Sequence, residues 1–413
     1  MYYYFIYKTK VQTMQKVFLP IITLILTIFL ISCGSGSSPE NKDNINTNSI
    51  DIDKTLKSKN YLKLHVEFKI FKLSPDGTKV YGIRNHTFFV TDITKVYHWL
   101  TKDEETIYQY NDIAKLEIDL PKDTSGDLSK PSQLLSDIEI SPNGNTAYLT
   151  TYDSRHGGGK GTLIIVDISD PKNPEVINKN RVNLYSDGIR IFPNGKYLLA
   201  LTDTEGGLPT DLTVIDIQDS NKPKVVGSIK KSTLSMDSIN AVFISSDSKR
   251  AYMATDNTIE VINLEEPTVP RQIKSISTGY MDALAIIVTK DRKRMYVNSE
   301  KNLKVYDIED DNMSFIHSHE IAGDGHYDEI ENITLSDDDN TLYATCSDEG
   351  VEPNNSLVVF DISDKDKLNL KKKIAAPRDI ALTYDAHNQS LSTDGKKFYT
   401  LTTWFYVMNL DIL

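Results

Sequence analysis

The 413-residue sequence predicts an all-β fold, a seven-bladed β-propeller whose last blade is closed by a strand from the N-terminal side. Two observations carry this prediction. A unit made of an apolar run, an Asp/Asn turn, a second apolar run and a third aliphatic run recurs seven times after residue 72. The units repeat about every fifty residues, which is typical of one propeller blade per unit.

The turn is the most regular part of the unit. Its anchors are Asp76, Asn143, Asn194, Asp247, Asp291, Asp338 and Asp394. The next residue is glycine in four copies and Ser248, Arg292 or Asp339 in the others. Asn-Gly or Asp-Gly between apolar runs is a strong hairpin signal, because a type I′ turn requires positive φ at both central residues. We therefore expect a tight hairpin between the first two strands of each unit.

The second and third strands follow at regular positions. Four residues after the second turn residue stand Tyr81, Tyr148, Leu199, Tyr252, Tyr296, Tyr343 and Tyr399. This constant offset indicates a strand of fixed register. The third strand is rich in β-branched and aromatic residues, as strands prefer. It ends at Asp or Asn followed by Ile or Leu, as in Asp167-Ile168, and we expect that side chain to form an Asx-turn.

The last unit lacks a fourth strand in this sequence, because Leu413 follows shortly after its third strand. The segment Tyr61–Val66 has strand alternation and no other partner. It is predicted to pair with Tyr406–Leu410, which would join the two ends of the ring and remove an exposed edge. A disordered lead-in is the alternative. Residues 94–130 are expected to hold the outer strand of the first blade and an insertion, within a propeller domain that spans residues 59–413.

The stretch Leu163–Pro174 resembles the LVIVD repeat of bacterial surface β-propellers. The Ser74–Gly77 and Ser141–Gly144 turns resemble those of YVTN-type propellers. The resemblance covers roughly residues 60–413 and implies the fold, whereas propellers of this kind serve many functions. Three units depart from the pattern by lacking the Pro and Gly of the turn.

The N-terminal region has the pattern of a lipoprotein signal peptide. Lysines precede an apolar run, residues 17–31, whose length suits a signal-peptide core. The run ends in Leu30-Ile31-Ser32-Cys33, which resembles the lipobox of bacterial lipoproteins. The resemblance implies removal of residues 1–32 and lipidation of Cys33, with Met14 as a possible true start. An ordinary signal anchor with a chance cysteine is the alternative.

The same resemblance implies a place in the bacterial cell envelope. The lipid would hold the protein to a membrane, and Gly34 after the lipidated cysteine is compatible with the outer membrane. Residues 33–58 are polar and are expected to form a flexible linker. The net charge of −12 argues against a nucleic-acid partner, because phosphate binding needs a basic face. Cys346 has no partner for a disulfide after Cys33 is lipidated and is expected to be a buried small hydrophobe.

The connections between second and third strands differ in length and point to one face. They are longest in units two, three and six, and long loops on a rigid scaffold often carry binding. The candidate ligand-binding residues there are Asp153, Arg155, His156, Asp203, Glu205, Asp348 and Glu349. Units two and three are neighbours, so their loops would form one wall of a site. Tolerated surface insertions are the alternative.

A second set of candidates lies near the starts of the innermost strands. Asp137 belongs to this recurrence, and the candidate metal ligands are Asp187, Asp237, Asp282, Asp328 and Asp385. Carboxylates converging on a central channel would suit a hard cation such as Ca²⁺. Their distance to the following turn varies, so they cannot all lie at one depth. Capping of the strand starts is the alternative explanation.

The sequence contains no evident catalytic constellation. Its eight histidines are scattered, and none accompanies a Ser or Cys nucleophile motif. We therefore expect a binding or scaffold module for an envelope protein or glycan. A propeller enzyme, lactonase-like or another hydrolase, is one alternative. A cation-binding structural protein of the envelope is the other.

Overall fold

The computed structural model describes residues 49–57, 61–102, 105–120, 133–153, 161–184, 186–204, 208–229, 239–255, 257–278, 285–299, 302–311, 313–321, 328–348, 356–375, 389–401 and 405–410. All of them belong to one compact unit, Asn46–Leu413. Apart from one short α-helix and one 3-10 turn, Glu309–Asp311, the described elements are β-strands. No helix within these ranges is long and apolar enough to cross a membrane.

Five sheets contain four antiparallel strands each, in consecutive order. The first comprises β7 (Gln133–Ile140), β8 (Thr146–Asp153), β9 (Gly161–Asp167) and β10 (Glu175–Leu184). The second comprises β11 (Ser186–Ile191), β12 (Tyr197–Thr204), β13 (Leu208–Asp216) and β14 (Lys224–Ile229). The third comprises β15 (Ile239–Ile244), β16 (Arg250–Thr255), β17 (Thr258–Asn263) and β18 (Arg271–Ser277). The fourth comprises β19 (Ile286–Val288), β20 (Arg294–Ser299), β21 (Asn302–Asp307) and β22 (Ser314–Glu320). The fifth comprises β23 (Asp328–Leu335), β24 (Thr341–Asp348), β25 (Ser356–Asp361) and β26 (Asn369–Ala375).

The remaining strands form one nine-stranded sheet. From the N-terminal part come β1 (Ile50–Asp51), β2 (Tyr61–His65), β3 (Ile70–Leu73), β4 (Lys79–Arg84), β5 (Thr87–Lys102) and β6 (Glu105–Glu117). From the C-terminal part come β27 (Gln389–Leu391), β28 (Lys397–Leu401) and β29 (Phe405–Asn409). Strand β6 is the expected outer strand beside β5, and the expected insertion is partly an extension of their long hairpin.

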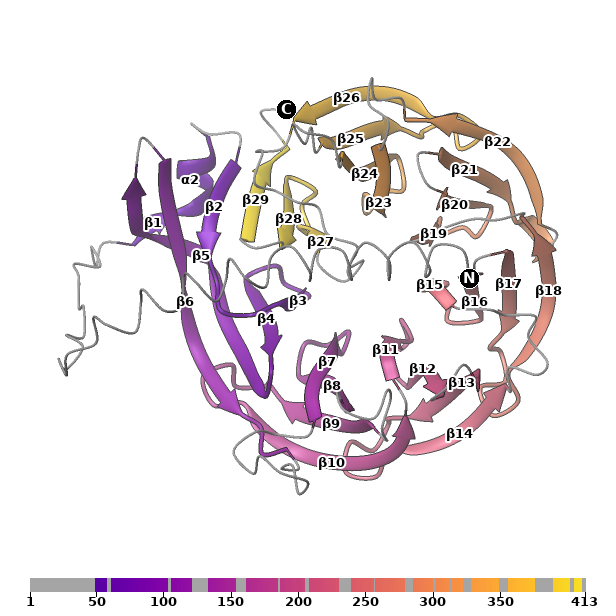
Figure 1. Cartoon of the computed structure of the whole chain (residues 1–413), viewed down its shortest axis with the longest axis horizontal. Coiled ribbons are helices and arrows are strands. Elements are labelled where there is room, and N and C mark those ends of the chain that lie inside the picture. Colours follow the sequence, from indigo (N-terminus) through magenta and orange to yellow (C-terminus); the bar gives the residue numbers. More distant parts are fainter. Residues whose placement is uncertain are drawn as a thin grey trace, which may run out of the picture. The chain divides into compact units, whose positions relative to one another are not determined.

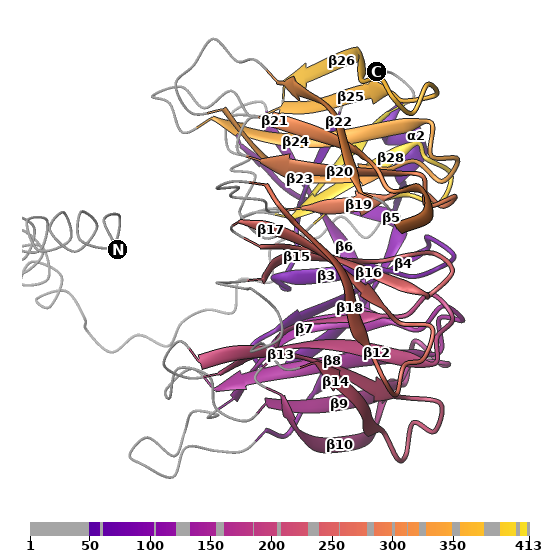
Figure 2. The same cartoon turned by 90° about the vertical axis from the view of Figure 1, so that its right-hand side faces the viewer.

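The predicted pairing of the two chain ends is confirmed. Strand β2 lies antiparallel to β29, with Tyr61 opposite Met408 and Leu64 opposite Phe405. On its other side β2 pairs in parallel with β6, so that His65 lies opposite Gln109. We call this junction of β29, β2 and β6 the seam. Figure 1 shows the sheets following one another around a ring, with β3, β7, β11, β15, β19, β23 and β27 nearest its centre. Figure 2 shows the same unit from the side, with the strands running from one face of the ring to the other.

The tight turns form as hairpins, but their type differs from the expected one. Positive φ occurs at Gly77, Gly144, Gly195 and Gly395 and not at the Asp or Asn before them, so the turns are not type I′. The reason is local bonding. Ser74 Oγ donates to Asp76 Oδ1 at 2.5 Å, and Thr78 N donates to the same oxygen at 3.0 Å. These bonds hold the Asp in its ordinary conformation and leave only the next residue left-handed.

The other repeated positions behave as predicted. The Tyr or Leu at the fixed offset is buried in all seven copies, with at most 8% of its surface exposed. The Asp or Asn that ends the third strand accepts a backbone N–H two residues later in the six copies where the acceptor bond is described; Ser169 N to Asp167 Oδ1, at 2.9 Å, is one example. Cys346 is buried, as expected.

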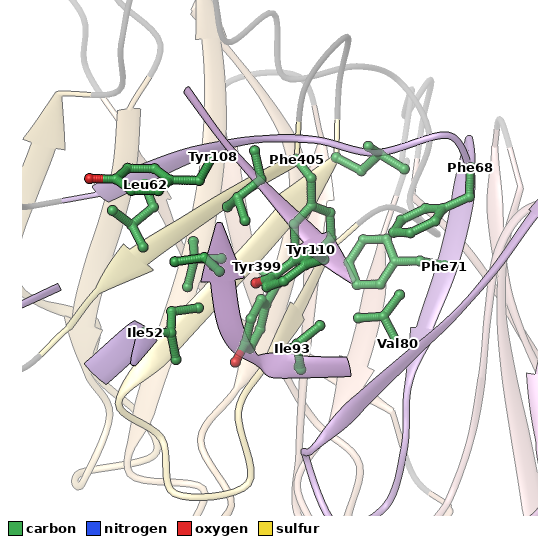
Figure 3. Close-up of a cluster of buried hydrophobic side chains, with 14 of the residues drawn as sticks. Ile52, Leu62, Phe68, Phe71, Val80, Ile93, Tyr108, Tyr110, Tyr399 and Phe405 are labelled. Carbon is green, nitrogen blue, oxygen red and sulfur yellow. The ribbon is translucent and has the colours of Figure 1, made fainter. Parts of the chain in front are cut away.

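The described structure includes residues before the expected domain boundary at residue 59. Helix α2 (Ile52–Leu56) is capped by Asp51, whose side chain accepts from Lys54 N at 3.0 Å. Ile52 and Leu56 are only 3% and 2% exposed, and both join the core of the seam. The linker prediction is therefore wrong for residues 49–57. Figure 3 shows this core, in which Tyr110, Phe71 and Phe405 pack together above Tyr399.

Candidate functional site

Charged side chains gather on the innermost strands of three successive sheets. Lys72 lies on β3, Asp137 and Glu139 lie on β7, and Arg190 lies on β11. These three strands are neighbours around the ring centre (Figure 1). Lys72 Nζ is 3.1 Å from Glu139 Oε1, and Arg190 Nη1 is 3.9 Å from the same carboxylate and 3.3 Å from Asp137 Oδ2. The four side chains form a continuous row of alternating charge.

Asp137 connects two sheets and has no exposed surface. Its carboxylate accepts from Ile138 N at 2.7 Å and, across the sheet boundary, from Ile189 N at 2.9 Å. Arg190 Nη1 donates to it as well. Because a buried carboxylate is costly unless it is paired and hydrogen-bonded, these bonds explain how Asp137 is tolerated there. It joins β7 to β11 as a structural residue.

Opposing effects act on the pKa of Glu139. Burial raises the pKa of its carboxyl, while the nearby Lys72 and Arg190 cations lower it in part, and the net shift is upward. Lys72 and Arg190 keep 29% and 23% of their side-chain surface exposed. The row therefore presents two partly exposed cations whose charges are matched by two buried or nearly buried carboxylates.

The register of the innermost strands separates the Asp residues that were expected to converge. Asp137 pairs with Thr150 directly after an irregularity in its strand, whereas Asp187 lies within the corresponding irregularity, between Ser186 and Gly188. Asp328 begins β23 opposite Asp348. These three therefore differ in depth. Asp237, Asp282 and Asp385 lie outside the described residues. Among the side chains that are described, no group of three or more His, Cys, Asp or Glu is placed to hold a metal ion.

The candidate residues of the loop-rich face lie partly within the described ranges. Asp153 ends β8, and Asp348 ends β24 opposite Asp328. Asp203 lies within β12, and pairing continues to Thr204 opposite Leu208. The long loop expected in unit three is therefore mostly strand. Unit three does not contribute the long loop that was predicted to form one wall of a site with unit two. Arg155, His156, Glu205 and Glu349 lie outside the described residues.

A polar cavity at the seam was not expected from the sequence. It has a volume of about 250 Å³ and is lined by the polar side chains His65, Glu67, Gln109, Asn111, Asp112 and Lys115. It forms where β2 and β6 separate: their pairing ends at His65 and Gln109, while β6 continues alongside β5 to Glu117. Where the two strands diverge, their side chains border the cavity instead of an adjacent strand.

Ion pairs organise this seam cavity. Lys115 Nζ lies 2.8 Å from Glu67 Oε1 and 3.2 Å from Asp112 Oδ2. Burial disfavours the charged ammonium, but the hydrogen bonds to Glu67 and Asp112 outweigh it and raise the pKa of Lys115. Burial lowers the pKa of His65, although the two carboxylates act in the opposite direction. Thr91 Oγ1 fixes Asp112 by donating to Oδ1 at 2.7 Å.

Comparison with known proteins identifies a sequence repeat and a fold. The LVIVD repeat model matches residues 157–180 and 351–375, on β9–β10 and β25–β26. Among curated proteins, none matches the sequence. The chain is an LVIVD-repeat β-propeller.

Several solved structures share the fold at low sequence identity. The Cps50 (Swd1) β-propeller domain of Myceliophteria thermophila is 12% identical with a TM-score of 0.55, covering 84% of this chain and 99% of its own. The hydrazine synthase of Kuenenia stuttgartiensis is 15% identical with a TM-score of 0.56, covering 84% and 97%. The periplasmic gluconolactonase PpgL of Pseudomonas aeruginosa is 12% identical with a TM-score of 0.54, covering 82% and 88%.

Proposed function

We propose that this chain is a lipid-anchored protein of the bacterial cell envelope whose seven-bladed propeller binds a protein or glycan partner. The anchor rests on Cys33 and the apolar run before it, and the outer membrane is the proposed destination because Gly34 follows the cysteine. Because one acyl chain binds a membrane only weakly, stable anchoring requires the several chains that lipoproteins of this kind carry.

The count of seven rests on how the nine-stranded sheet divides. Its one parallel contact is β2 with β6, which separates β3-β4-β5-β6 from β27-β28-β29-β2. Two blades of four strands result, in addition to the five separate sheets. The first and last hairpins also adjoin: a Cβ added at Gly77 would lie 3.1 Å from Thr393 Oγ1. This contact supports a ring in which the first and last blades are neighbours.

The binding role rests on one observation, the unequal connections between second and third strands. Residues 154–160 join β8 to β9, and residues 349–355 join β24 to β25. The equivalent connection from β4 to β5 is only Asn85-His86. The two long connections occur at strand ends opposite the tight turns, on a scaffold of antiparallel four-stranded sheets. Binding residues are commonly carried on such loops.

A hydrolase is the second candidate. Asp137 and Glu139 supply two carboxylates near the ring centre, and the Pseudomonas structure with this fold is described as a gluconolactonase. The carboxylates are bound to Arg190 and Lys72, which favours a structural role for them. A cation-binding role depends on the Asp residues outside the described ranges. It is tested by whether saturating Ca²⁺ raises the free energy of unfolding.

In-cell crosslinking tests the binding proposal. A photoreactive residue is placed at position 156 or 349, and at Lys249 in a tight turn as the control. We expect envelope adducts from the first two positions and none from Lys249. Replacing residues 154–160 and 349–355 with Asn-Gly turns, in a chain without the photoreactive residue, should abolish co-purification of the crosslinked partner without unfolding the ring. Equal adducts from Lys249, or hydrolysis of gluconolactone by the purified chain, would contradict the binding role.

Cys33→Ala should release the protein from membranes, and retention there would contradict the anchor.

A further inference from the structure

The seam cavity carries an inference that depends on neither the anchor nor the loops. Its side chains come from two segments far apart in sequence, the end of β2 with Val66-Glu67, and the middle of β6. Strand β2 is fixed by its pairing with β29, and β6 is fixed by its pairing with β5. The polar groups are therefore held on strands or directly beside them, which limits the entropy lost when a ligand binds.

A strand irregularity brings the key charges together. Residues three apart on a regular strand point to opposite faces. In β6 the pairing with β5 shifts between Asp112 and Ala114, which inserts one extra residue. Asp112 and Lys115 consequently share one face and form an ion pair, and Glu67 completes it from the other segment. Bulges frequently redirect side chains in this way at functional sites.

The chemistry of the cavity defines its ligand. Glu67 and Asp112 accept hydrogen bonds, Lys115 donates them, and the amides of Gln109 and Asn111 do both. Among the side chains that line the cavity, two carboxylates and one ammonium leave a single negative charge when His65 is neutral. A compound with many hydroxyl groups can use donors and acceptors alike, whereas an acidic compound meets an unfavourable field. The volume of about 250 Å³ lies near the lower limit for small-molecule sites.

We propose that the seam cavity binds a single sugar ring or a similar polyhydroxy compound, neutral or amino-substituted, and discriminates against acidic ones. The hydroxyl groups donate to Asp112 and Glu67 and accept from Lys115 and the two amides. An amino substituent adds attraction to the net negative charge. None of the residues that line the cavity belongs to the long connections 154–160 and 349–355, so its failure would leave the binding role of those loops intact.

Three probes of one ring size test the proposal: glucose, glucosamine and glucuronate, added to the full chain at neutral pH. Binding is followed by saturation-transfer NMR and titration. We expect glucosamine to bind at least as tightly as glucose and glucuronate to bind about tenfold more weakly, as one unfavourable charge contact predicts. Absence of saturation transfer to glucose and glucosamine, or equal binding of glucuronate, would overturn the proposal.

A variant and a matched control place the binding in the cavity. Asn111 is exposed, so Asn111→Ala should fold normally and weaken glucose binding about fivefold, the effect of losing one hydrogen bond. Asn369 is an exposed strand residue of another sheet, and Asn369→Ala should leave binding unchanged. Gln109→Ala provides a second cavity variant. Unchanged binding in both cavity variants, or equal loss in the control, would show that the sugar binds elsewhere.

Discussion

A disulfide across the seam tests whether β2 closes the ring in the register that the structure gives. Tyr61 and Met408 lie directly opposite each other on β2 and β29. Opposite residues of antiparallel strands have Cα atoms about 4.5–5.5 Å apart, within the range that a disulfide spans. The variant Tyr61→Cys with Met408→Cys, in a background of Cys33→Ser and Cys346→Ala, should therefore oxidise readily.

The expected gain in stability follows from the length of chain that the bond encloses. Nearly the whole propeller lies between the two positions, about 350 residues. The chain-entropy model then gives about 6 kcal/mol for restriction of the unfolded state, as an upper value because strain in the folded state subtracts from it. Comparing the oxidised and reduced forms of one variant by urea unfolding cancels the cost of the substitutions themselves.

The control for this experiment shifts one cysteine by a single position. Tyr61→Cys with Val407→Cys places the two thiols on opposite faces of the sheet, because side chains alternate along a strand. It should oxidise slowly or not at all. Equal oxidation of the shifted pair would show that the register is wrong. Oxidation of the matched pair without added stability would show that β2 does not close the ring.

Three further predictions concern individual residues. Gly144 and Gly395 have similar φ values, 74° and 68°, but a Cβ at Gly144 would lie 3.3 Å from Pro75 Cδ and one at Gly395 meets nothing within 4 Å. Both alanine variants should lose about 1 kcal/mol of unfolding free energy, and Gly144→Ala should lose more, as measured by urea unfolding; equal losses would contradict contact between neighbouring turns. Arg190→Met should cost about 3 kcal/mol, because it removes the cation beside fully buried Asp137, whereas Lys72→Met should cost less; equal losses would contradict the inter-sheet role of Asp137. The hydrogen bonds from Ser336 and from Asn340 N lower the pKa of Asp338 to about 2, so its stabilising effect is present above its ordinary value of 3.8 and is lost as the pH falls toward 2. Asp338→Asn should therefore flatten acid unfolding in that window, and an unchanged acid transition would refute the assignment.

Local features of the fold could be predicted from the sequence because they depend on neighbouring residues. The buried Tyr252 and the Asx-turn of Asp167 follow from short patterns. The turn type could not be read from Asp-Gly alone, since Ser74 also bonds to Asp76. Helix α2 had a detectable signal, Ile52 and Leu56 four residues apart after a capping Asp51, but the polar residues around it concealed the pattern.

The sites were less predictable, because they depend on contacts between distant segments. No local pattern places Glu67 beside Lys115, and a single extra residue in β6 decides which face Asp112 occupies. The recurring Asp residues looked equivalent in sequence, yet the register separates Asp137 from Asp187. A one-residue difference along a strand reverses the direction of the side chain, so an approximate recurrence cannot define a common ligand set.

The turns that lost glycine show how the ring tolerates departures from its repeat. Ser248, Arg292 and Asp339 keep positive φ, which costs about 1–2 kcal/mol for a residue with a side chain. Each side chain reaches the turn of the preceding sheet. Ser248 Oγ accepts from Asn194 N at 3.0 Å, Arg292 Nη1 donates to Asp247 Oδ2 at 2.7 Å, and Asp339 Oδ2 accepts from Lys290 N at 2.5 Å. A hydrogen bond contributes about 0.5–1.5 kcal/mol and a charged one more, which is enough to offset the strain. At three of the four turn glycines, Gly77, Gly144 and Gly195, the preceding turn packs close instead, as Pro142 does at Gly195. Contact between adjacent turns is therefore retained by two different means, which explains why units with a degenerate turn still occupy regular places in the ring.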